Sequence, residues 1–206
     1  MKAFGLTGNI ASGKSTVSRT FTDEGIAVVD ADAISHRVTG PGTEGLQALV
    51  AAFGPDMLTR LGELDRKKLG ARVFADRDAR TLLNSIVHPR IAAATRQRFI
   101  ELDKLGVQLA CYDAALLVEN HMQDAFRPLV VVTVPEDVQL TRLMARNGLT
   151  RDEALERISS QMPQAKKAAA ADIVINNDSD LATLEMRAKH ALEEVRRRLS
   201  TLDMLL

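Results

Sequence analysis

Cysteine is nearly absent from the sequence, with Cys111 the single one in 206 residues. One cysteine excludes a disulfide framework within the chain, so a reducing compartment is its natural home and we expect a cytoplasmic protein. The thiol lies in the apolar run 107–112, where we expect it to act as a small buried hydrophobic side chain.

Long hydrophobic runs and an excess of one charge are also absent. No stretch approaches the roughly 18 apolar residues of a membrane span, and the apolar N-terminal stretch is too short for a signal peptide. The 27 basic and 27 acidic residues cancel, whereas nucleic-acid-binding proteins usually show a basic excess. We therefore expect a globular protein without membrane or nucleic-acid partners, present as a monomer or a weak homo-oligomer.

Five short apolar runs predict the strands of an α/β fold. None of them alternates strictly between apolar and polar residues, which indicates strands that are covered on both faces. Helical patterns separate the runs, so we expect right-handed βαβ units and a doubly wound parallel sheet flanked by helices. The predicted strands cover residues 3–6, 26–29, 107–112, 129–134 and 172–176.

A block of helical patterns lies between the second and third predicted strands. The block is too long for a plain crossover, so we expect a helical insertion beside the sheet, where a second substrate could bind. Apolar residues recur with helical spacing in four segments, and we expect His88-Pro89 to separate the third helix from the fourth. Beyond the fourth strand, Thr150 and Glu153 form a capping-box pattern that predicts the start of another helix.

The most specific motif of the chain is Gly8-Asn9-Ile10-Ala11-Ser12-Gly13-Lys14-Ser15, which matches G-x-x-x-x-G-K-[ST] at every fixed position. A polyphosphate needs several N–H donors that point into one concavity, and glycines let the backbone approach it closely. A predicted strand precedes the motif, and a helix from about Lys14 to Glu24 is predicted to follow it. This is the structural context that the motif requires.

The loop predicts a binding site for a nucleoside triphosphate. We expect Lys14 to reach the β- and γ-phosphates as a point charge, and the Ser15 hydroxyl to bind Mg²⁺. Thr16 either adds a hydroxyl near the α-phosphate or is an ordinary residue of the first helical turn. The expected ATP contacts come from Gly8, Ala11, Ser12, Gly13, Lys14, Ser15 and Thr16.

Two carboxylates follow the second predicted strand. Ligands of open α/β sheets bind beyond the carboxyl ends of the strands, so we expect Asp30 and Asp32 near the phosphates. Asp32 is our candidate for the general base that accepts the proton of an attacking hydroxyl. Asp30 either shares this task or caps the next helix. His36, one turn after Asp32, either touches the acceptor or is a surface residue.

Two further acids follow the third predicted strand. Asp113 stands where a Walker-B-like carboxylate is expected, and Glu119 comes shortly after it. Either could hold Mg²⁺ through water, because Mg²⁺ keeps several waters and takes few direct carboxylates. Asp32 is a third candidate for a water-mediated contact. The residues alone leave a structural role open for Asp113 and Glu119.

A group of cations lies between the fourth and fifth predicted strands. Arg142 and Arg146 are one helical turn apart and share a face. An arginine placed at transition-state charge can contribute about 10³ or more in rate. Most of the group are otherwise expected on solvated helix faces. Its members are Arg142, Arg146, Arg151, Arg157, Lys166 and Lys167.

Several segments together resemble the dephospho-CoA kinases, a family of P-loop kinases. The resemblance covers nearly the whole chain in the family's order. The phosphate loop alone is shared by many nucleotide-binding proteins, whereas the His-Pro segment and the acid-rich second strand are more specific. The segments are 5–17, Asp30-Ala31-Asp32 with His36, 64–66, 83–91 around His88-Pro89, 116–119, 139–146 and 171–177.

The resemblance implies ATP-dependent phosphorylation of the ribose 3′-hydroxyl of dephospho-coenzyme A, the last step of coenzyme A biosynthesis, with Mg²⁺ as cofactor. It also implies a P-loop fold with a five-stranded parallel sheet, built as one kinase domain in three parts. These are a core of about 1–35, 107–141 and 168–206, a helical acceptor-binding region of about 36–106, and a lid of about 142–167.

The resemblance also assigns roles to single residues. Asp32 is similar to the family's proposed general base, and Arg142 to the lid arginine that contacts the transferring phosphoryl group. Asn176 and Asn177 are similar to the loop that borders the adenine. The expected acceptor-binding residues, each of which could instead be structural, are His36, Arg66, His88 and Glu119.

Three positions depart from the family pattern. Asn9 and Ala11 stand where the family often has glycine, but these are variable positions of the loop, so we expect an intact phosphate cradle. Ala115 stands where the family often has proline, which affects local stiffness.

The closest alternative is another small-molecule P-loop kinase, acting on a nucleoside monophosphate or a small alcohol. A GTPase is disfavoured, because the D-x-x-G match at 103–106 precedes the third strand and no Asn-Lys-x-Asp motif occurs. An inactive scaffold is disfavoured because Lys14, Ser15, Asp32 and Arg142 are all present.

Overall fold

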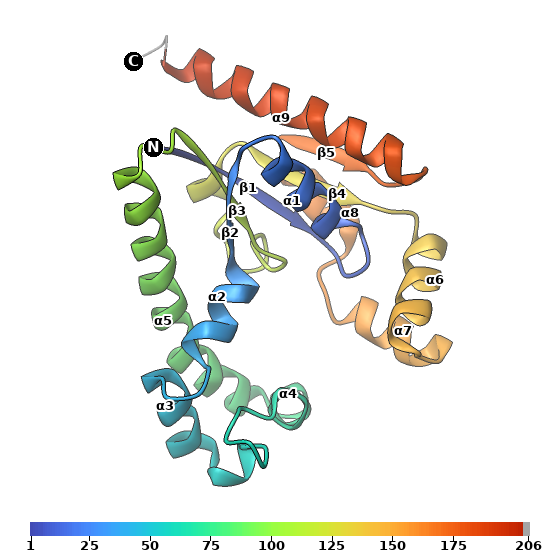
Figure 1. Cartoon of the computed structure of the whole chain (residues 1–206). Helices are drawn as coiled ribbons and strands as arrows, with labels where there is room; N and C mark the ends of the chain where they lie inside the picture. The colour runs from blue at the N-terminus through green and yellow to red at the C-terminus, as the bar shows by residue number, and fades with distance from the viewer. Residues whose placement is uncertain (204–206) are drawn as a thin grey trace. The chain divides into compact units, whose positions relative to one another are not determined.

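The computed structural model describes residues 1–203, which divide into two compact units. The smaller unit is Asp30–Glu101, and the larger comprises the described residues on either side of it. A five-stranded parallel sheet in the order β2-β3-β1-β4-β5 forms the centre of the larger unit (Figure 1). The predicted α/β fold is thereby confirmed. The strands are β1 (Lys2–Gly8), β2 (Ala27–Asp30), β3 (Leu109–Asp113), β4 (Leu129–Thr133) and β5 (Ile173–Asn176).

Strand β1 lies at the middle of the sheet and pairs in parallel with β3 and β4. Leu6 of β1 is in register with Asp113 on one side and Val130 on the other. Every residue of β4 is buried, as expected for a strand whose side chains are covered on both faces. The third strand begins and ends later than predicted. Asp113 is therefore its last residue rather than the residue after it.

Helices α1 (Lys14–Asp23) and α9 (Leu181–Asp203) pack against each other and share one apolar core with the sheet (Figure 1). Within this core the rings of Phe4 and Phe21 meet edge to face, with centroids 5.5 Å apart. Elsewhere, α8 (Gln164–Ala169) packs against β4, and the 3₁₀ turn η2 (Gln123–Phe126) packs against β1. The packed sheet thus positions the loops at its carboxyl edge.

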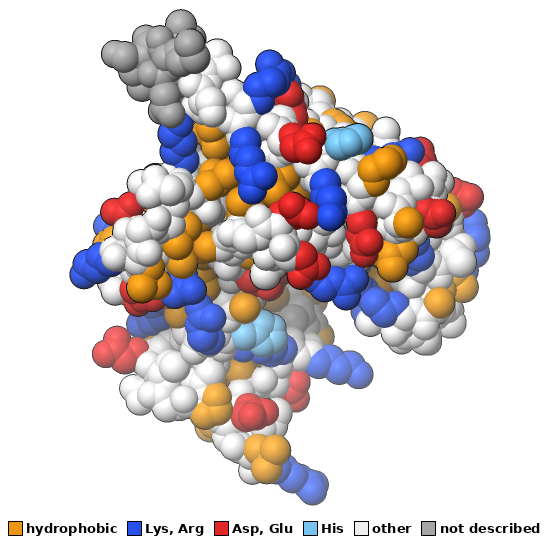
Figure 2. All heavy atoms as spheres, turned by 45° about the horizontal axis from the view of Figure 1, so that its top comes forward, with side chains coloured by type: hydrophobic (Ala, Val, Ile, Leu, Met, Phe, Trp, Pro, Cys, Tyr) orange, Lys and Arg blue, Asp and Glu red, His pale blue; other side chains and the backbone are white. Residues whose placement is uncertain are grey.

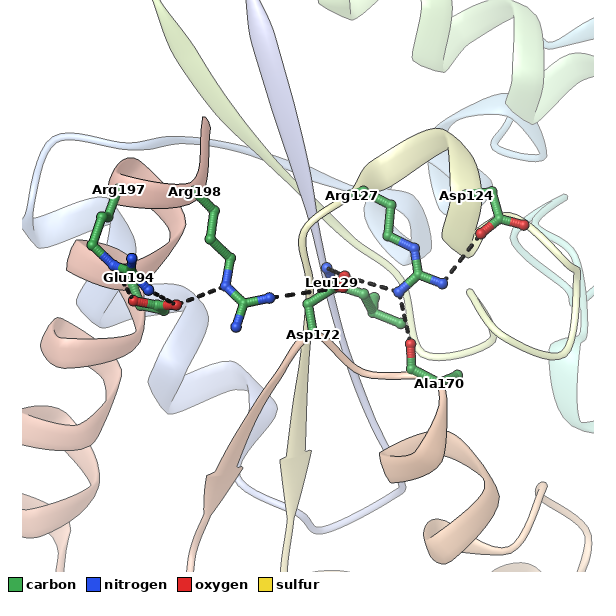
Figure 3. Close-up of polar contacts among 8 residues, drawn as sticks. All are labelled: Asp124, Arg127, Leu129, Ala170, Asp172, Glu194, Arg197 and Arg198. Atoms are coloured by element: carbon green, nitrogen blue, oxygen red, sulfur yellow. Dashed lines mark hydrogen bonds and ion pairs between the residues drawn. The ribbon is translucent and has the colours of Figure 1, made fainter. Parts of the chain in front are cut away.

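A network of charged side chains joins the start of β4, the start of β5 and α9 (Figure 3). Asp172 Oδ2 accepts hydrogen bonds from the Leu129 N–H at 2.6 Å and from Arg127 Nη1 at 2.8 Å. Arg198 of α9 lies 3.9 Å from Asp172 Oδ1 and is held in turn by Glu194 at 2.7 Å. The network therefore fixes the end of the sheet that lies opposite the phosphate loop.

Strand β4 continues into a helical hairpin made of α6 (Glu136–Asn147) and α7 (Arg151–Ser159). The predicted capping box is present, with Thr150 Oγ1 accepting from the Glu153 N–H and the Glu153 carboxylate accepting from the Thr150 N–H. The hairpin has a small core of its own, formed by Leu140, Leu143 and Ala154.

The smaller unit is helical, in keeping with the block of helical patterns in the sequence. It contains α2 (Ala31–Val38), α3 (Glu44–Phe53), the 3₁₀ turn η1 (Pro55–Met57), α4 (Arg66–Ala75) and most of α5 (Arg77–Lys104). Its core is formed by Leu46, Leu49, Phe53, Met57, Leu64, Leu69, Ala79 and Val87.

Helix α5 is one continuous helix of 28 residues with Pro89 inside it. The prediction of two helices separated at His88-Pro89 is therefore wrong. Proline lacks an N–H and usually ends or kinks a helix. Here apolar residues on both sides of the proline pack into the same core, and the Arg90 guanidinium donates to the Ile86 carbonyl at 2.7 Å in the interrupted turn. These contacts let the helix continue.

The surface agrees with the balanced charge of the sequence. Acidic and basic side chains are interspersed on the face shown in Figure 2. Within the described part of the chain, every helix is too short or too polar to cross a membrane.

Candidate active site

The loop between β1 and α1 has the tight backbone that its motif requires. Gly13 has a φ of +94°, and a Cβ at this position would lie 2.2 Å from Asn177 Nδ2. A Cβ on Gly8 would lie 2.6 Å from Ser12 Oγ and 2.8 Å from the Val132 carbonyl oxygen. Both positions therefore need glycine, because any larger residue would displace neighbouring atoms.

Ala11 adopts the left-handed backbone region, with a φ of 59°. This conformation costs a non-glycine residue about 1–2 kcal/mol. Ala11 and its neighbour Ile10 pack against the core of the α6–α7 hairpin, which holds the loop in this shape. The departure from glycine at position 11 is thus accommodated by packing.

The hydroxyl of Ser12 is buried in the loop and has no hydrogen-bond partner among the residues that the structure describes. Buried polar groups normally find a partner, so an orphaned donor needs an explanation. A hydroxyl in this position fits the oxygen atoms of a bound phosphate.

Lys14 and Asp113 form an ion pair at the carboxyl ends of β1 and β3. Their side chains are 17% and 5% exposed. Lys14 is the first residue of α1 and Asp113 the last of β3, so sheet register and helix start together set the contact. The structure thus brings the phosphate-loop lysine and the predicted Walker-B-like carboxylate together.

The donors near the loop fit a magnesium ion carried by a nucleotide. Ser15 is exposed in the first turn of α1, directly after the lysine that pairs with Asp113. The described residues include no cluster of three or more His, Cys, Asp or Glu side chains that could hold a metal ion by themselves. Mg²⁺ bound with phosphates needs only one or two protein ligands, because phosphate oxygens and waters complete its shell.

The loop after β5 braces the phosphate loop. Asn177 is buried, and its side-chain N–H donates to the Ser12 carbonyl at 2.8 Å. Arg142 of α6 donates to Asn177 Oδ1 at 3.4 Å. Asn176 is exposed, and its Oδ1 accepts from the Thr133 hydroxyl at 2.7 Å. Arg142 and Asn177, both predicted from the resemblance, therefore lie beside the phosphate loop, and Asn176 bonds the end of β4.

Glu119 is paired with Lys167, a member of the cation group. Its Oε1 lies 2.9 Å from Lys167 Nζ, and its Oε2 is buried without a hydrogen-bond partner among the described residues. Lys167 also donates to the Ala115 carbonyl at 2.7 Å, and the Thr7 hydroxyl donates to the same carbonyl at 3.1 Å. The pair thus lies beside the last residues of β1.

Lys167 is fully buried in α8, which makes the expectation of a solvated helix face wrong for this member of the cation group. Burial lowers the pKa of its ammonium group, and the hydrogen bond and charge of Glu119 oppose that shift. The only sequence signal is weak: Lys167 directly precedes the four alanines 168–171, and small residues permit close packing around a long side chain.

In the smaller unit Asp30 caps a helix. Its carboxylate accepts from the Ala33 N–H at 2.9 Å, so it is the N-cap of α2, one of the two readings that the sequence left open. Asp32 follows in the first turn of α2 with its side chain exposed, and His36 lies in the last turn and is exposed as well.

Two more of the expected acceptor-binding residues belong to this unit. Arg66, the first residue of α4, donates to Thr39 Oγ1 at 2.9 Å and to the His36 carbonyl at 3.4 Å. Partial burial lowers the pKa of its guanidinium. His88 is exposed on α5, immediately before the internal proline. The structure therefore brings Arg66 and His36 together through the end of α2.

A parallel sheet with this loop at the carboxyl end of its central strand belongs to the P-loop kinases. The solved dephospho-CoA kinase from Campylobacter jejuni superposes with a TM-score of 0.63 at 27% identity, covering 94% of this chain and 97% of that one. The family model for dephospho-CoA kinase matches residues 2–183. The chain belongs to the dephospho-CoA kinase family, whose activity is the last step of coenzyme A biosynthesis.

Curated relatives agree with this family. A dephospho-CoA kinase of Corynebacterium efficiens is 43% identical over 195 residues, which is 95% of this chain and 98% of that protein. A dephospho-CoA kinase of Carboxydothermus hydrogenoformans is 46% identical over 177 residues, which is 86% of each. The resemblance inferred from the motifs is thereby confirmed at the level of the family.

Proposed function

We propose that this chain transfers the γ-phosphoryl group of ATP to the ribose 3′-hydroxyl of dephospho-CoA, giving coenzyme A and ADP. The observation that carries the proposal is the Lys14–Asp113 pair at the head of a glycine-dependent phosphate loop, in a chain of the dephospho-CoA kinase family. Lys14 is a point charge for the β- and γ-phosphates, and the N-terminus of α1 adds unpaired N–H groups.

Nucleotide binding is assigned to the loop and to the segment after β5. The Ser12 hydroxyl, buried and without a partner among the described residues, donates to a phosphate oxygen. Asn176 and Asn177 border the adenine. The full set of proposed ATP contacts is Gly8, Ala11, Ser12, Gly13, Lys14, Ser15, Thr16, Asn176 and Asn177.

Magnesium accompanies the nucleotide in this proposal. Ser15 is its direct ligand, and Asp113 or Asp32 contacts it through water. When bound, the ion neutralises charge on the β- and γ-phosphates. Asp113 already faces Lys14, so its carboxylate also orients the lysine.

Transfer itself is assigned to Asp32 and Arg142. Asp32 accepts the proton of the attacking hydroxyl, which suits an exposed carboxylate two residues after the end of a parallel strand. Arg142 stabilises charge on the transferring group, since it already reaches the asparagine that supports the phosphate loop. The proposed acceptor contacts are His36, Arg66, His88 and Glu119.

We further propose a cytoplasmic enzyme that is a monomer or a weak homo-oligomer. The single cysteine is fully buried. Burial raises the pKa of its thiol well above the ordinary value, so it is a packed side chain rather than a reactive group. A chain without disulfides suits a reducing compartment.

A competition between acceptors tests the reaction. Purified chain with ATP and Mg²⁺ is offered dephospho-CoA, nucleoside monophosphates and small alcohols in parallel, and we expect the fastest transfer to dephospho-CoA. Faster transfer to any other acceptor would overturn the proposed substrate.

The role of Asp32 is tested in the same assay. Asp32→Asn keeps the size of the side chain but removes the base, and we expect kcat to fall about 10²–10⁴-fold. The matched control is Asp30→Asn, because an asparagine still caps α2 and should leave kcat near the wild-type value. Equal losses in both variants would contradict the assignment of Asp32.

A further inference from the structure

The backbone of Ile10, in the middle of the phosphate loop, forms two hydrogen bonds with side chains of the α6–α7 hairpin region. Gln139 of α6 donates its side-chain N–H to the Ile10 carbonyl at 2.8 Å. Gln161, just beyond α7, accepts from the Ile10 N–H through Oε1, also at 2.8 Å. One glutamine therefore satisfies the backbone acceptor of Ile10 and the other satisfies its backbone donor.

The chemistry of the backbone fixes the orientation of both side chains. Only an amide N–H can meet the Ile10 carbonyl, and only an amide oxygen can meet the Ile10 N–H. Gln139 is 2% exposed, so its hydrogen bond is made without competition from bulk water. Residues 139 and 161 lie where the chain enters and leaves the hairpin, so both bonds join the phosphate loop to the base of the hairpin.

Neighbouring contacts also join the phosphate loop to the hairpin and fix the base of the hairpin. The Asn9 side-chain N–H donates to the Met162 carbonyl at 3.0 Å. The side chain of Ile10 packs against the hairpin core. At the base of the hairpin, Gln164 accepts from the Val134 N–H and donates to the Val134 carbonyl, each at 2.9 Å.

We infer that Gln139 and Gln161 are positioning residues that hold the phosphate loop in its ATP-binding shape, and we name them the glutamine clamp. Ile10 immediately precedes Ala11, the residue in the left-handed region. A loop with such a strained residue needs outside contacts to keep one shape, and the clamp supplies two of them. The inference rests on the proposed role of this loop in binding ATP.

The clamp acts on nucleotide binding rather than on the chemical step. A loop held in shape before ATP arrives loses less freedom on binding, and this benefit is the same for the ground state and the transition state. Removing it should therefore raise KM for ATP and leave kcat unchanged. The KM for dephospho-CoA should also stay unchanged, because both glutamine side chains bond the phosphate loop through Ile10.

The first experiment removes each side-chain amide. We expect Gln139→Leu and Gln161→Leu each to raise the KM for ATP about 3- to 10-fold, the effect of one hydrogen bond, with kcat within twofold of wild type. The matched control is Gln97→Leu, which removes an exposed glutamine that bonds Glu101 on its own helix. Lower melting temperatures with an unchanged KM for ATP would assign the glutamines a merely structural role and overturn the inference.

A charge-matched pair of variants tests the direction of each hydrogen bond. Gln161→Glu still presents an acceptor to the Ile10 N–H, whereas Gln139→Glu turns a carboxylate towards the Ile10 carbonyl. Both add one negative charge near the loop, so a difference between them reports the hydrogen bonds. We expect the KM for ATP to be clearly lower for Gln161→Glu than for Gln139→Glu. The reverse order, or equal values, would overturn the clamp.

A readout independent of activity separates this inference from the proposed function. Amide hydrogen exchange at Ile10, followed by NMR, should be about 3- to 10-fold faster in Gln161→Leu than in wild type and unchanged in Gln97→Leu. An unchanged rate in Gln161→Leu would refute the clamp. If wild-type protein does not phosphorylate dephospho-CoA, the proposed function fails, while the exchange rates still decide whether the clamp exists.

Discussion

At the scale of single residues, the Lys14–Asp113 ion pair connects proposed ATP binding with the stability of the folded protein. Both side chains are largely withdrawn from water, so each charge depends on the other for compensation. Removing one partner of such a pair takes away the opposite charge that offsets the desolvation of the other, which costs more than the pair contributes in the intact protein. The lysine that we propose for phosphate binding therefore also neutralises a strand-end carboxylate.

We expect Lys14→Ala to lower kcat/KM by a factor of about 100 or more, because charge stabilisation at the transferring phosphoryl group is lost. It should also lower the free energy of unfolding by roughly 3 kcal/mol, because Asp113 loses the Lys14 ammonium. Steady-state kinetics and chemical denaturation measure the two effects separately.

The double variant Lys14→Ala/Asp113→Asn is the control for this prediction. Removing the second charge should restore most of the stability and none of the activity. Near wild-type turnover in Lys14→Ala would contradict the proposed role of Lys14 in phosphoryl transfer, whatever the stability of the variant.

Adjacent lysines in α8 have different surroundings. Lys167 is fully buried against Glu119 and the Ala115 carbonyl, whereas Lys166 is exposed. We expect Lys167→Ala to destabilise the protein by about 3 kcal/mol, since Glu119 is then left without its cation. Lys166→Ala is the matched control and should change stability little. Equal melting temperatures for the two variants would contradict a structural ion pair.

At the scale of elements, α5 carries a proline in its interior. The proline removes one backbone hydrogen bond and crowds the preceding turn. Core contacts of both halves of the helix offset this cost. Local propensity does not include such contacts, so the sequence predicted two helices.

We expect Pro89→Ala to raise the free energy of unfolding by about 1–3 kcal/mol, because the missing backbone hydrogen bond can then form. Thermal unfolding measures the gain. A lower melting temperature would show that the proline bend is required by the packing of the smaller unit. Ala92→Gly, at an exposed position of the same helix, is the control and should destabilise by about 1 kcal/mol.

At the scale of the whole molecule, the Asp172 network makes stability depend on pH. Burial alone would raise the pKa of Asp172, but the hydrogen bonds from Arg127 and the Leu129 N–H outweigh it and hold the pKa below its ordinary value of 3.8. Hydrogen bonds from Arg197 and Arg198 likewise lower the pKa of Glu194 to about 2. Carboxylates with lowered pKa values stabilise the folded state above their ordinary pKa, and this stabilisation is lost as the pH falls through the folded-state value.

Asp172→Ala should therefore lower the free energy of unfolding by about 1–3 kcal/mol at neutral pH, where the carboxylate is fully ionised. The difference in free energy of unfolding between wild type and variant should stay constant down to about pH 5. It should narrow as the pH falls below the ordinary pKa of an aspartate. Denaturation at a series of pH values measures it. Asp124→Ala removes the exposed carboxylate that pairs with the same Arg127 and should show a much smaller gap. A gap for Asp172→Ala that widens at low pH would contradict this reading.

Most of the fold was predictable from the order of apolar runs and helical patterns. The parallel sheet, the phosphate loop between β1 and α1 and the capping box at Thr150 all follow from local residue patterns, and the structure confirms them. The continuity of α5 was not predictable, because it depends on apolar contacts distant in sequence from Pro89.

The candidate site was predictable only where a motif fixes it. Residue patterns pointed to the phosphate loop and to Asp113, and the family resemblance pointed to Arg142. In the structure the loop contacts Asp113 through Lys14 and Arg142 through Asn177. Lys167 has only the weak signal of the alanines that follow it, and no residue pattern marks Gln139 or Gln161. The importance of all three arises from partners far away along the chain. Asp32, His36, Arg66 and His88 stay predictions.

The most direct test of the central claim is the identity of the phosphorylated product. Purified protein is incubated with ATP, Mg²⁺ and dephospho-CoA, and the products are followed by ³¹P NMR. We predict one ADP for each new phosphomonoester, with the phosphate on the ribose 3′-hydroxyl and far less product formed by Lys14→Ala over the same time. ADP released without a phosphorylated acceptor, or a phosphate on another hydroxyl, would contradict the claim.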